Sequence, residues 1–103
     1  MIKHIETEKE FDEIIKSGNV VVDFYATWCA PCRALAPILE DIDIELKDIV
    51  IAKVDVDELS IVASRYGIMS IPTLLFFNNG SLVHEQIGLL PPAQLLALFK
   101  KHL

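Results

Sequence analysis

The chain has 103 residues, a formal net charge of −6 and a hydrophobic fraction of 52%. This length fits a single domain over residues 1–103, and the apolar fraction can build a core without a disulfide framework or a metal. The negative charge argues against nucleic-acid binding, because phosphate contacts require clustered Lys and Arg residues.

No apolar run in the sequence is long enough to cross a bilayer, which argues against a membrane protein. The first residues are already charged and lack the basic-then-apolar pattern of a leader. We therefore expect a cytoplasmic protein without membrane contacts. The chain has two cysteines, and in a cytoplasmic chain of this size chemistry explains such a pair better than a structural framework does.

The amino-terminal third predicts a strand, a helix and a second strand. Residues Lys3–Ile5 suit a short edge strand. Thr7 opens a helix with a capping box, because Glu10 follows three residues later, and Gly18 is expected to end this helix. Residues Val20–Ala26 are almost continuously apolar, which is typical of a central strand covered on both faces. Such coverage favours helices on both sides of a sheet.

The middle of the chain predicts a helix, a strand and a second, shorter helix. After Cys29, apolar residues recur at spacings of three and four, as in an amphipathic helix. These residues are Leu35, Ile38, Leu39, Ile42 and Leu46. Residues 49–56 predict a buried strand, and the shorter helix that follows is expected to close at Gly67.

The end of the chain predicts a hairpin and a last helix. Strands over 73–77 and 82–87 are joined by the residues 78–80, Asn-Asn-Gly, which are a strong hairpin signal. Pro91 and Pro92 then start the last helix. The complete order is βαβαβαββα, which indicates an α/β protein with a mixed sheet between helix layers.

The two cysteines are predicted to lie where the central strand passes into the next helix. There, unpaired backbone amides and the positive end of the helix dipole lower the pKa of a thiol and favour the reactive thiolate. The two residues between Cys29 and Cys32 let the second sulfur reach back to the first, and Pro31 holds the turn in shape. Cys32, one turn into the helix, is expected to be the more buried and less reactive cysteine.

Two other interpretations of the pair are a zinc site and inert structural cysteines. Zinc needs about four ligands, and the chain adds only three dispersed histidines, His4, His84 and His102. Inert cysteines are disfavoured by their position at a helix start. A redox pair is therefore the favoured interpretation, and His84 and His102 are expected to be surface residues.

Several segments are distinctive in combination and in this order. They are Val22–Cys32, Ala36–Ile38, Ala52–Asp57, Gly67–Thr73, Asn79-Gly80 and Gly88. On these segments the chain resembles the thioredoxin family along essentially its whole length. The resemblance implies the thioredoxin fold, in which four helices flank a central mixed five-stranded sheet. It also implies a dithiol–disulfide oxidoreductase that reduces disulfides in protein substrates.

The resemblance assigns roles to the residues around the cysteines. Cys29 is implied to be the nucleophile that attacks a substrate disulfide, and Cys32 to resolve the mixed disulfide. Ile71-Pro72 is similar to the family's cis-proline segment, which faces the cysteines and pairs its backbone with an extended substrate strand. Trp28 is expected over the site, where it shapes the docking surface, although a lone tryptophan can also be a core residue.

Two charged residues match a proton-transfer pair of the family. Asp23 matches a buried acid with a raised pKa that exchanges a proton with Cys32. An exposed Asp at a strand edge is the alternative, but the apolar neighbours Val22 and Phe24 favour burial. Lys53 matches a lysine that pairs with this acid, and a lysine stem that reaches toward solvent explains it nearly as well.

The resemblance also implies a set of partner contacts around the site. These are Trp28, Ala30, Pro31, Val56, Ile71, Pro72, Ile87 and Gly88. Three positions depart from the common family pattern, because Ala30 and Ser70 stand where glycine is usual and Tyr25 where many members carry tryptophan. Ala30 lies beside the reactive sulfur, so it bears on the reduction potential and on the approach of a partner backbone.

The leading hypothesis is a general protein-disulfide reductase, which the family implies is re-reduced by a flavin-dependent, NADPH-driven thioredoxin reductase. The Cys29–Cys32 disulfide would be the redox centre, without a bound cofactor or metal, in a protein that acts as a monomer. An oxidase or isomerase would use the same residues, but oxidising relatives commonly carry His at the position of Pro31. A third hypothesis is a binding subunit of a larger enzyme, a role that would survive replacement of both cysteines.

Overall fold

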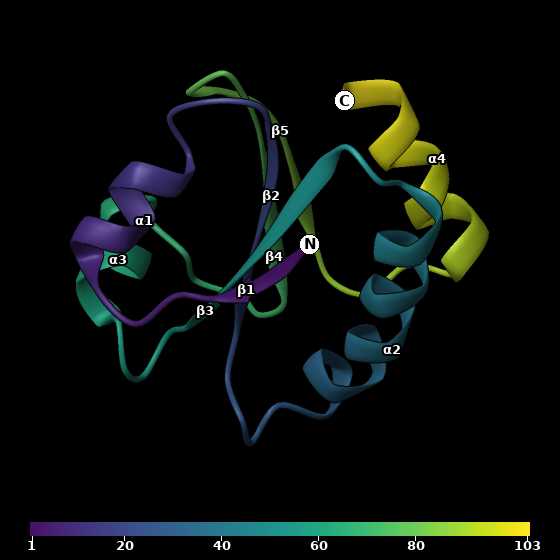
Figure 1. The fold of residues 1–103 in the computed structure, drawn as a ribbon. Helices are drawn as coiled ribbons and strands as arrows, with labels where there is room; N and C mark the ends of the chain where they lie inside the picture. The colour runs from purple at the N-terminus through teal and green to yellow at the C-terminus, as the bar shows by residue number, and fades with distance from the viewer.

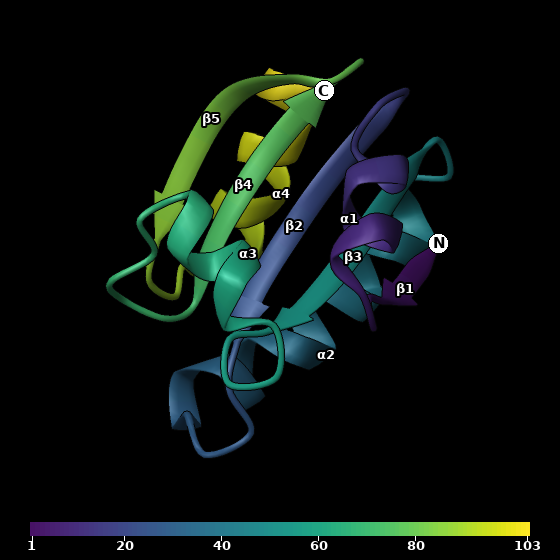
Figure 2. The same cartoon turned by 90° about the vertical axis from the view of Figure 1, so that its left-hand side faces the viewer.

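A computed structural model describes residues 1–103 as one sheet with two helices on each face (Figure 1). In chain order the elements are β1 (Ile2–His4), α1 (Glu8–Ile14), β2 (Asn19–Tyr25), α2 (Ala30–Glu45), β3 (Ile49–Asp55), α3 (Ser60–Arg65), β4 (Thr73–Asn78), β5 (Ser81–Ile87) and α4 (Pro92–His102). Figure 2 shows α1 and α3 in front of the sheet, with α2 and α4 behind it. The predicted α/β architecture of a mixed five-stranded sheet flanked by four helices is confirmed.

The central strand of the sheet is β2, because the strands lie in the order β1-β3-β2-β4-β5. β2 runs parallel to β3 and antiparallel to β4, which makes the sheet mixed. In the parallel pair Asp23 lies opposite Lys53, and Tyr25 lies opposite Asp55. These four side chains share one face of the sheet, since residues two apart in a strand point the same way. They lie at the carboxyl ends of the two strands, where the chain leaves β2 for α2.

The sheet separates two apolar layers. The layer beneath α1 and α3 includes Phe11 and Phe77, and the layer beneath α2 and α4 includes Leu39 and Phe99. Residues 20–24 of β2 are all buried. The prediction of a central strand covered on both faces is therefore confirmed, and side chains 20–24 of β2 are withdrawn from water by helices as well as by neighbouring strands.

Helix α1 begins where the sequence predicts but ends earlier. The Thr7 hydroxyl accepts a hydrogen bond from the Glu10 amide at 3.0 Å, so Thr7 is the N-cap residue. The helix ends at Ile14, whereas Gly18 was predicted to end it. Gly18 lies instead in the turn into β2, where its φ is +76° and its amide donates to the Asn79 side chain at 2.8 Å. The glycine marks this turn and not the end of the helix.

The hairpin between β4 and β5 turns at Asn79 and Gly80. Their φ values are +47° and +87°, and two successive positive φ values are typical of the type I′ turn that Asn-Gly favours. The hairpin predicted from these residues is confirmed.

We expect Gly80→Ala to lower the free energy of unfolding by about 1 kcal/mol, because a residue with a Cβ rarely adopts a positive φ. The added Cβ would also lie 3.4 Å from the carbonyl oxygen of Lys16. Urea denaturation measures the loss, with Ser81→Ala at the next exposed position as the control. Equal denaturation midpoints for Gly80→Ala and the parent protein would contradict this expectation.

Two histidines that were expected at the surface are half buried and stack on each other. The ring centroids of His84 in β5 and His102 in α4 are 4.0 Å apart, and the ring planes are within 7° of parallel. Both rings also contact Phe76, with centroid separations of 5.4 and 5.9 Å. The surface prediction was therefore wrong in part, because the pair holds the last turn of α4 against the sheet.

Candidate active site

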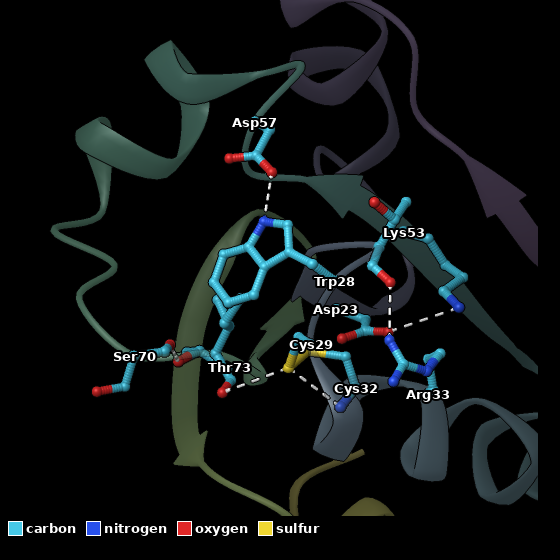
Figure 3. The surroundings of a disulfide bond; sticks show 11 residues. Asp23, Trp28, Cys29, Cys32, Arg33, Lys53, Asp57, Ser70 and Thr73 are labelled. Carbon is cyan, nitrogen blue, oxygen red and sulfur yellow. Dashed lines mark hydrogen bonds and ion pairs between the residues drawn. A yellow bond between two sulfur atoms is a disulfide. The ribbon is translucent and has the colours of Figure 1, made fainter.

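The two cysteines lie where β2 passes into α2, with Cys29 at the end of the turn and Cys32 in the first turn of the helix (Figure 3). Cys29 is the N-cap residue of α2, and its Sγ accepts a hydrogen bond from the Cys32 amide at 3.2 Å. Pro31 lies in the first helical turn, where its missing amide proton leaves no hydrogen bond unmade. The Cys29 sulfur therefore lies at the positive end of the α2 dipole, a position that stabilises a thiolate.

Cys29 and Cys32 are joined by a disulfide bond, with their Cα atoms 5.3 Å apart. Both residues are 5% exposed, so the prediction that Cys32 is the more buried was wrong for this oxidised state. The bond draws both sulfurs into one apolar cluster with Ala26. The partly buried side chains packed against this cluster are Tyr25, Val56 and Ile71.

Trp28 lies beside the disulfide with 67% of its surface exposed (Figure 3). Its indole N–H donates a hydrogen bond to Asp57 Oδ2 at 2.8 Å. This bond links the turn before α2 to the loop after β3 and fixes the orientation of the ring. Trp28 is thus a surface residue and not a core residue.

The Ile71–Pro72 peptide bond is cis and precedes β4. The Ile71 carbonyl oxygen lies 3.9 Å from Cys29 Sγ, and neither the amide nor the carbonyl of Ile71 makes a backbone hydrogen bond. Pro72 is buried, and its carbonyl accepts a hydrogen bond from the Gly88 amide at 2.9 Å. Ile87 beside it is 57% exposed. Ile71 therefore borders the disulfide with backbone groups that are not paired to other backbone, and the Gly88–Pro72 hydrogen bond holds the end of β5 next to this segment.

Asp23 points toward the cysteine turn from β2, and its side chain is 1% exposed. The Lys53 ammonium lies 3.8 Å from Asp23 Oδ2, while Oδ1 has no hydrogen-bond partner. Burial raises the pKa of Asp23 from 3.8 to about 6, and the positive charge of Lys53 opposes this rise. Asp23 is therefore buried, as its apolar neighbours indicated, and it titrates close to neutral pH.

Lys53 extends from β3 with its side chain 15% exposed. Besides the Asp23 carboxylate, its ammonium contacts the ring of Tyr25, whose centroid lies 4.9 Å from Nζ. Tyr25 follows Asp23 by two residues on the same face of β2, which explains how both side chains reach one lysine. Of the two explanations weighed for Lys53, the ion pair with Asp23 describes the structure better than a stem that reaches into solvent.

A cavity of about 260 Å³ opens on the Cys32 side of the disulfide. It is lined by Tyr25, Ala26, Thr27, Cys32, Arg33, Ala36 and Lys53. The Arg33 guanidinium donates a hydrogen bond to the Thr27 carbonyl at 3.0 Å. The volume has room for water next to Cys32, and the polar side chains in its mostly apolar lining are Thr27, Arg33 and Lys53.

Three residues of this site were not assigned a place in it from the sequence. Asp57 orients Trp28, the Arg33 side chain donates a hydrogen bond to the Thr27 carbonyl in the turn, and Tyr25 contacts Lys53. Tyr25 stood out only as a departure from the common family pattern. The contacts of Asp57 and Tyr25 join segments about 30 residues apart through the register of β2 and β3, and no local pattern reveals that register.

Two general features of the chain bear on the chemistry that the site offers. The structure holds no group of three or more His, Cys, Asp or Glu side chains placed to bind a metal ion. None of the four helices combines the length and the apolarity that a bilayer crossing requires. The groups present at the site are a disulfide, a buried carboxyl group and a lysine.

Comparisons with known proteins agree on one family. The family profile described as Thioredoxin matches residues 2–101. A thioredoxin of Mycoplasmoides gallisepticum is 43% identical over 100 residues, covering 96% of this chain and 100% of that protein. A thioredoxin of Chlamydia pneumoniae is 46% identical over 102 residues, covering 99% of each chain. A solved structure of Plasmodium falciparum thioredoxin is similar with a TM-score of 0.91 and 38% identity, covering 98% of this chain and 99% of that one.

Proposed function

This chain belongs to the thioredoxin family, and from that premise we propose that its cysteine pair reduces disulfide bonds in protein substrates. Family membership and the bonded cysteines make the protein a dithiol–disulfide oxidoreductase. The observation that carries the proposal is the position of Cys29 Sγ at the start of α2, where it accepts a hydrogen bond from the Cys32 amide at 3.2 Å. A thiolate at this position is stabilised and ready to attack.

The proposed reaction consists of two thiol–disulfide exchanges. In the first, the Cys29 thiolate attacks one sulfur of the substrate disulfide. The substrate S–S bond breaks, a mixed disulfide forms, and the other substrate sulfur leaves as a thiolate that takes up a proton. In the second exchange Cys32 loses its proton and attacks Cys29 Sγ, which closes the internal disulfide and releases the second substrate thiol. Two electrons pass from the protein to the substrate.

We assign Asp23 as the group that accepts the Cys32 proton in the second exchange, with Lys53 adjusting its affinity for that proton. The assignment is supported by the burial of Asp23 and by its pKa of about 6, which lies between those of ordinary carboxyl and thiol groups. The cavity beside Cys32 has space for a water molecule, and it is also lined by Lys53, the ion-pair partner of Asp23.

We further propose that an extended substrate segment pairs with the backbone of Ile71 before β4. Support comes from Ile71, whose amide and carbonyl make no backbone hydrogen bond and whose carbonyl oxygen lies 3.9 Å from Cys29 Sγ, since an added strand needs unpaired backbone groups. The residues proposed to border this segment are Trp28, Ala30, Pro31, Val56, Pro72, Ile87 and Gly88. Most of this contact is with backbone, so the protein would accept many substrate sequences.

The family implies thioredoxin reductase as a general partner, and we propose that this partner is the flavin-dependent, NADPH-driven enzyme. The chain would need no bound cofactor, because the dithiol is itself the redox centre. We place the protein in the cytoplasm, where thiols are kept reduced. We also propose one domain over residues 1–103, since a single sheet carries all four helices, and a protein that acts as a monomer.

The reduction potential of the cysteine pair tests this proposal. Equilibration in dithiol/disulfide buffers, followed by Trp28 fluorescence and by alkylation of free thiols, should give about −270 mV, as is typical of thioredoxins. A potential of about −180 to −120 mV would indicate an isomerase or an oxidase instead. Cys32→Ser cannot close the internal disulfide and should show no transition. If the parent protein also formed no reversible disulfide, a binding subunit would become the better interpretation.

A further inference from the structure

The Tyr25 side chain contacts both Lys53 and the apolar cluster that contains the disulfide. Its ring centroid lies 4.9 Å from Lys53 Nζ, and the same ammonium lies 3.8 Å from Asp23 Oδ2. The Tyr25 side chain also packs against the cluster that contains the disulfide, and it lines the cavity beside Cys32. The lysine is therefore held between an aromatic face and a buried carboxylate.

We propose that Tyr25 is a positioning residue for the proton transfer assigned to Asp23, because its ring holds the Lys53 ammonium beside the carboxylate. The catalytic meaning of this inference rests on the proposed function. The arrangement itself rests on the contacts of three side chains.

The carboxylate alone does not fix the position of the lysine. The separation of 3.8 Å between Lys53 Nζ and Asp23 Oδ2 exceeds the length of a hydrogen bond. A lysine side chain has many rotamers, and the entropy lost on ordering it opposes a loose ion pair. An aromatic face attracts an ammonium group through the negative charge above its ring. The Tyr25 ring thus supplies the second attraction that orders the lysine.

The ring of Tyr25, and not its hydroxyl group, makes this contact. Burial raises the pKa of Tyr25, and the carboxylates of Asp55, Glu58 and Asp23 add to the rise. The phenol therefore stays neutral throughout the range in which Asp23 titrates. A phenylalanine at this position would keep the attraction, whereas an aliphatic residue would lose it.

Two other charged side chains of the site have hydrogen-bond partners of their own. The Arg33 side chain on α2 donates a hydrogen bond to the Thr27 carbonyl. The Asp55 side chain at the end of β3 accepts hydrogen bonds from the backbone amides of Asp57 and Glu58. Lys53 is the charge that lowers the pKa of Asp23 against the effect of burial. A change in the order of Lys53 should therefore be measurable at Asp23.

The experiment is a titration of the Asp23 side chain in the oxidised protein by ¹³C NMR, with Asp23→Asn to identify its signal. We expect Tyr25→Leu to lower the acid dissociation constant of Asp23 roughly threefold, because a less ordered Lys53 stabilises the carboxylate less. Tyr25→Phe should leave this constant close to that of the parent. If Tyr25→Leu does not fold, Tyr25→Met makes the same change with an unbranched side chain.

The matched control is the same pair of titrations in a Lys53→Met background. There, Tyr25→Leu should no longer alter the dissociation constant of Asp23. The proposal is overturned by an equal change in both backgrounds, by no change in either, or by Tyr25→Phe behaving like Tyr25→Leu. The titration needs no substrate, so its failure leaves the reductase proposal intact, and a failed reduction-potential test leaves the titration interpretable.

Discussion

Cys29→Ser will abolish the reduction of protein disulfides, whereas Cys32→Ser will stop the reaction at the mixed disulfide. The first variant lacks the sulfur at the amino end of α2 that accepts the Cys32 amide. A serine hydroxyl at that position is a far weaker nucleophile, so we expect the rate to fall by at least about 10³-fold. The second variant keeps the attacking sulfur but has no thiolate to resolve the bond that it forms.

Mass spectrometry of each variant after incubation with a disulfide-bonded peptide distinguishes the two outcomes. Cys32→Ser should gain the mass of one half of the peptide and lose it on treatment with dithiothreitol, and Cys29→Ser should show no such adduct. The unfolding midpoints of both variants serve as the control for structure. If Cys29→Ser retained activity, or if only Cys32→Ser lost the ability to form the adduct, the assigned roles would be reversed or wrong.

Asp23→Asn will stabilise the oxidised protein at pH 7 by about 3 kcal/mol, because the burial that raises the pKa of Asp23 from 3.8 to about 6 makes its charged form costly in the folded state. Well below pH 3.8 the carboxyl group is protonated in both the folded and the unfolded chain, so the parent bears no such cost. As the pH rises from 4 to 6, the unfolded chain ionises first, and the parent loses stability relative to the variant. Above pH 6 the full cost is present.

Urea denaturation of the oxidised parent and of Asp23→Asn at intervals from pH 4 to pH 7 measures this difference. The gap in the free energy of unfolding should open over that range. In a Lys53→Met background it should open further, since the charge that favours the ionised carboxylate has been removed. A gap that stays constant from pH 4 to pH 7, or that closes as the pH rises, would contradict the assignment.

The cost of burying an ionised Asp23 links the stability of the protein to its proposed reaction. Asp23 lies between apolar residues on the central strand and leaves Oδ1 without a partner, an arrangement that lowers stability. We have proposed that the same carboxyl group takes the proton of Cys32. Asp23→Asn should therefore be both more stable and slower in the second exchange, as is common where a functional group is kept at the expense of stability.

The fold was predictable from the sequence where local signals agree with the final structure. The apolar run of residues 20–24, the capping residue Thr7 and the Asn79-Gly80 turn each determine their own conformation through neighbours in the chain. The end of α1 was predicted wrongly because Gly18 is suited to a left-handed turn as well as to a helix end. In such cases the choice depends on a distant contact, here with the Asn79 side chain.

The site was predictable in part. The cysteine pair and Asp23 stand in segments with strong local and family patterns. Their surroundings depend on which residues of β2 and β3 lie opposite each other, and that register is a property of the assembled sheet. The ring of Tyr25 over Lys53 follows from it. The half-buried stack of His84 and His102 likewise requires β5 and α4 to meet.

The central position of β2 also sets the order in which a growing chain can complete this site. β2 and both cysteines are synthesised within the first third of the chain, but the antiparallel neighbour β4 runs from Thr73 to Asn78. Until residue 78 has left the ribosome, β2 has an open edge and Asp23 cannot be enclosed on both sides. Pairing between such distant segments is a slow step in folding. The thiols of the nascent protein are therefore present well before Asp23 becomes buried and can take its proposed part in proton transfer.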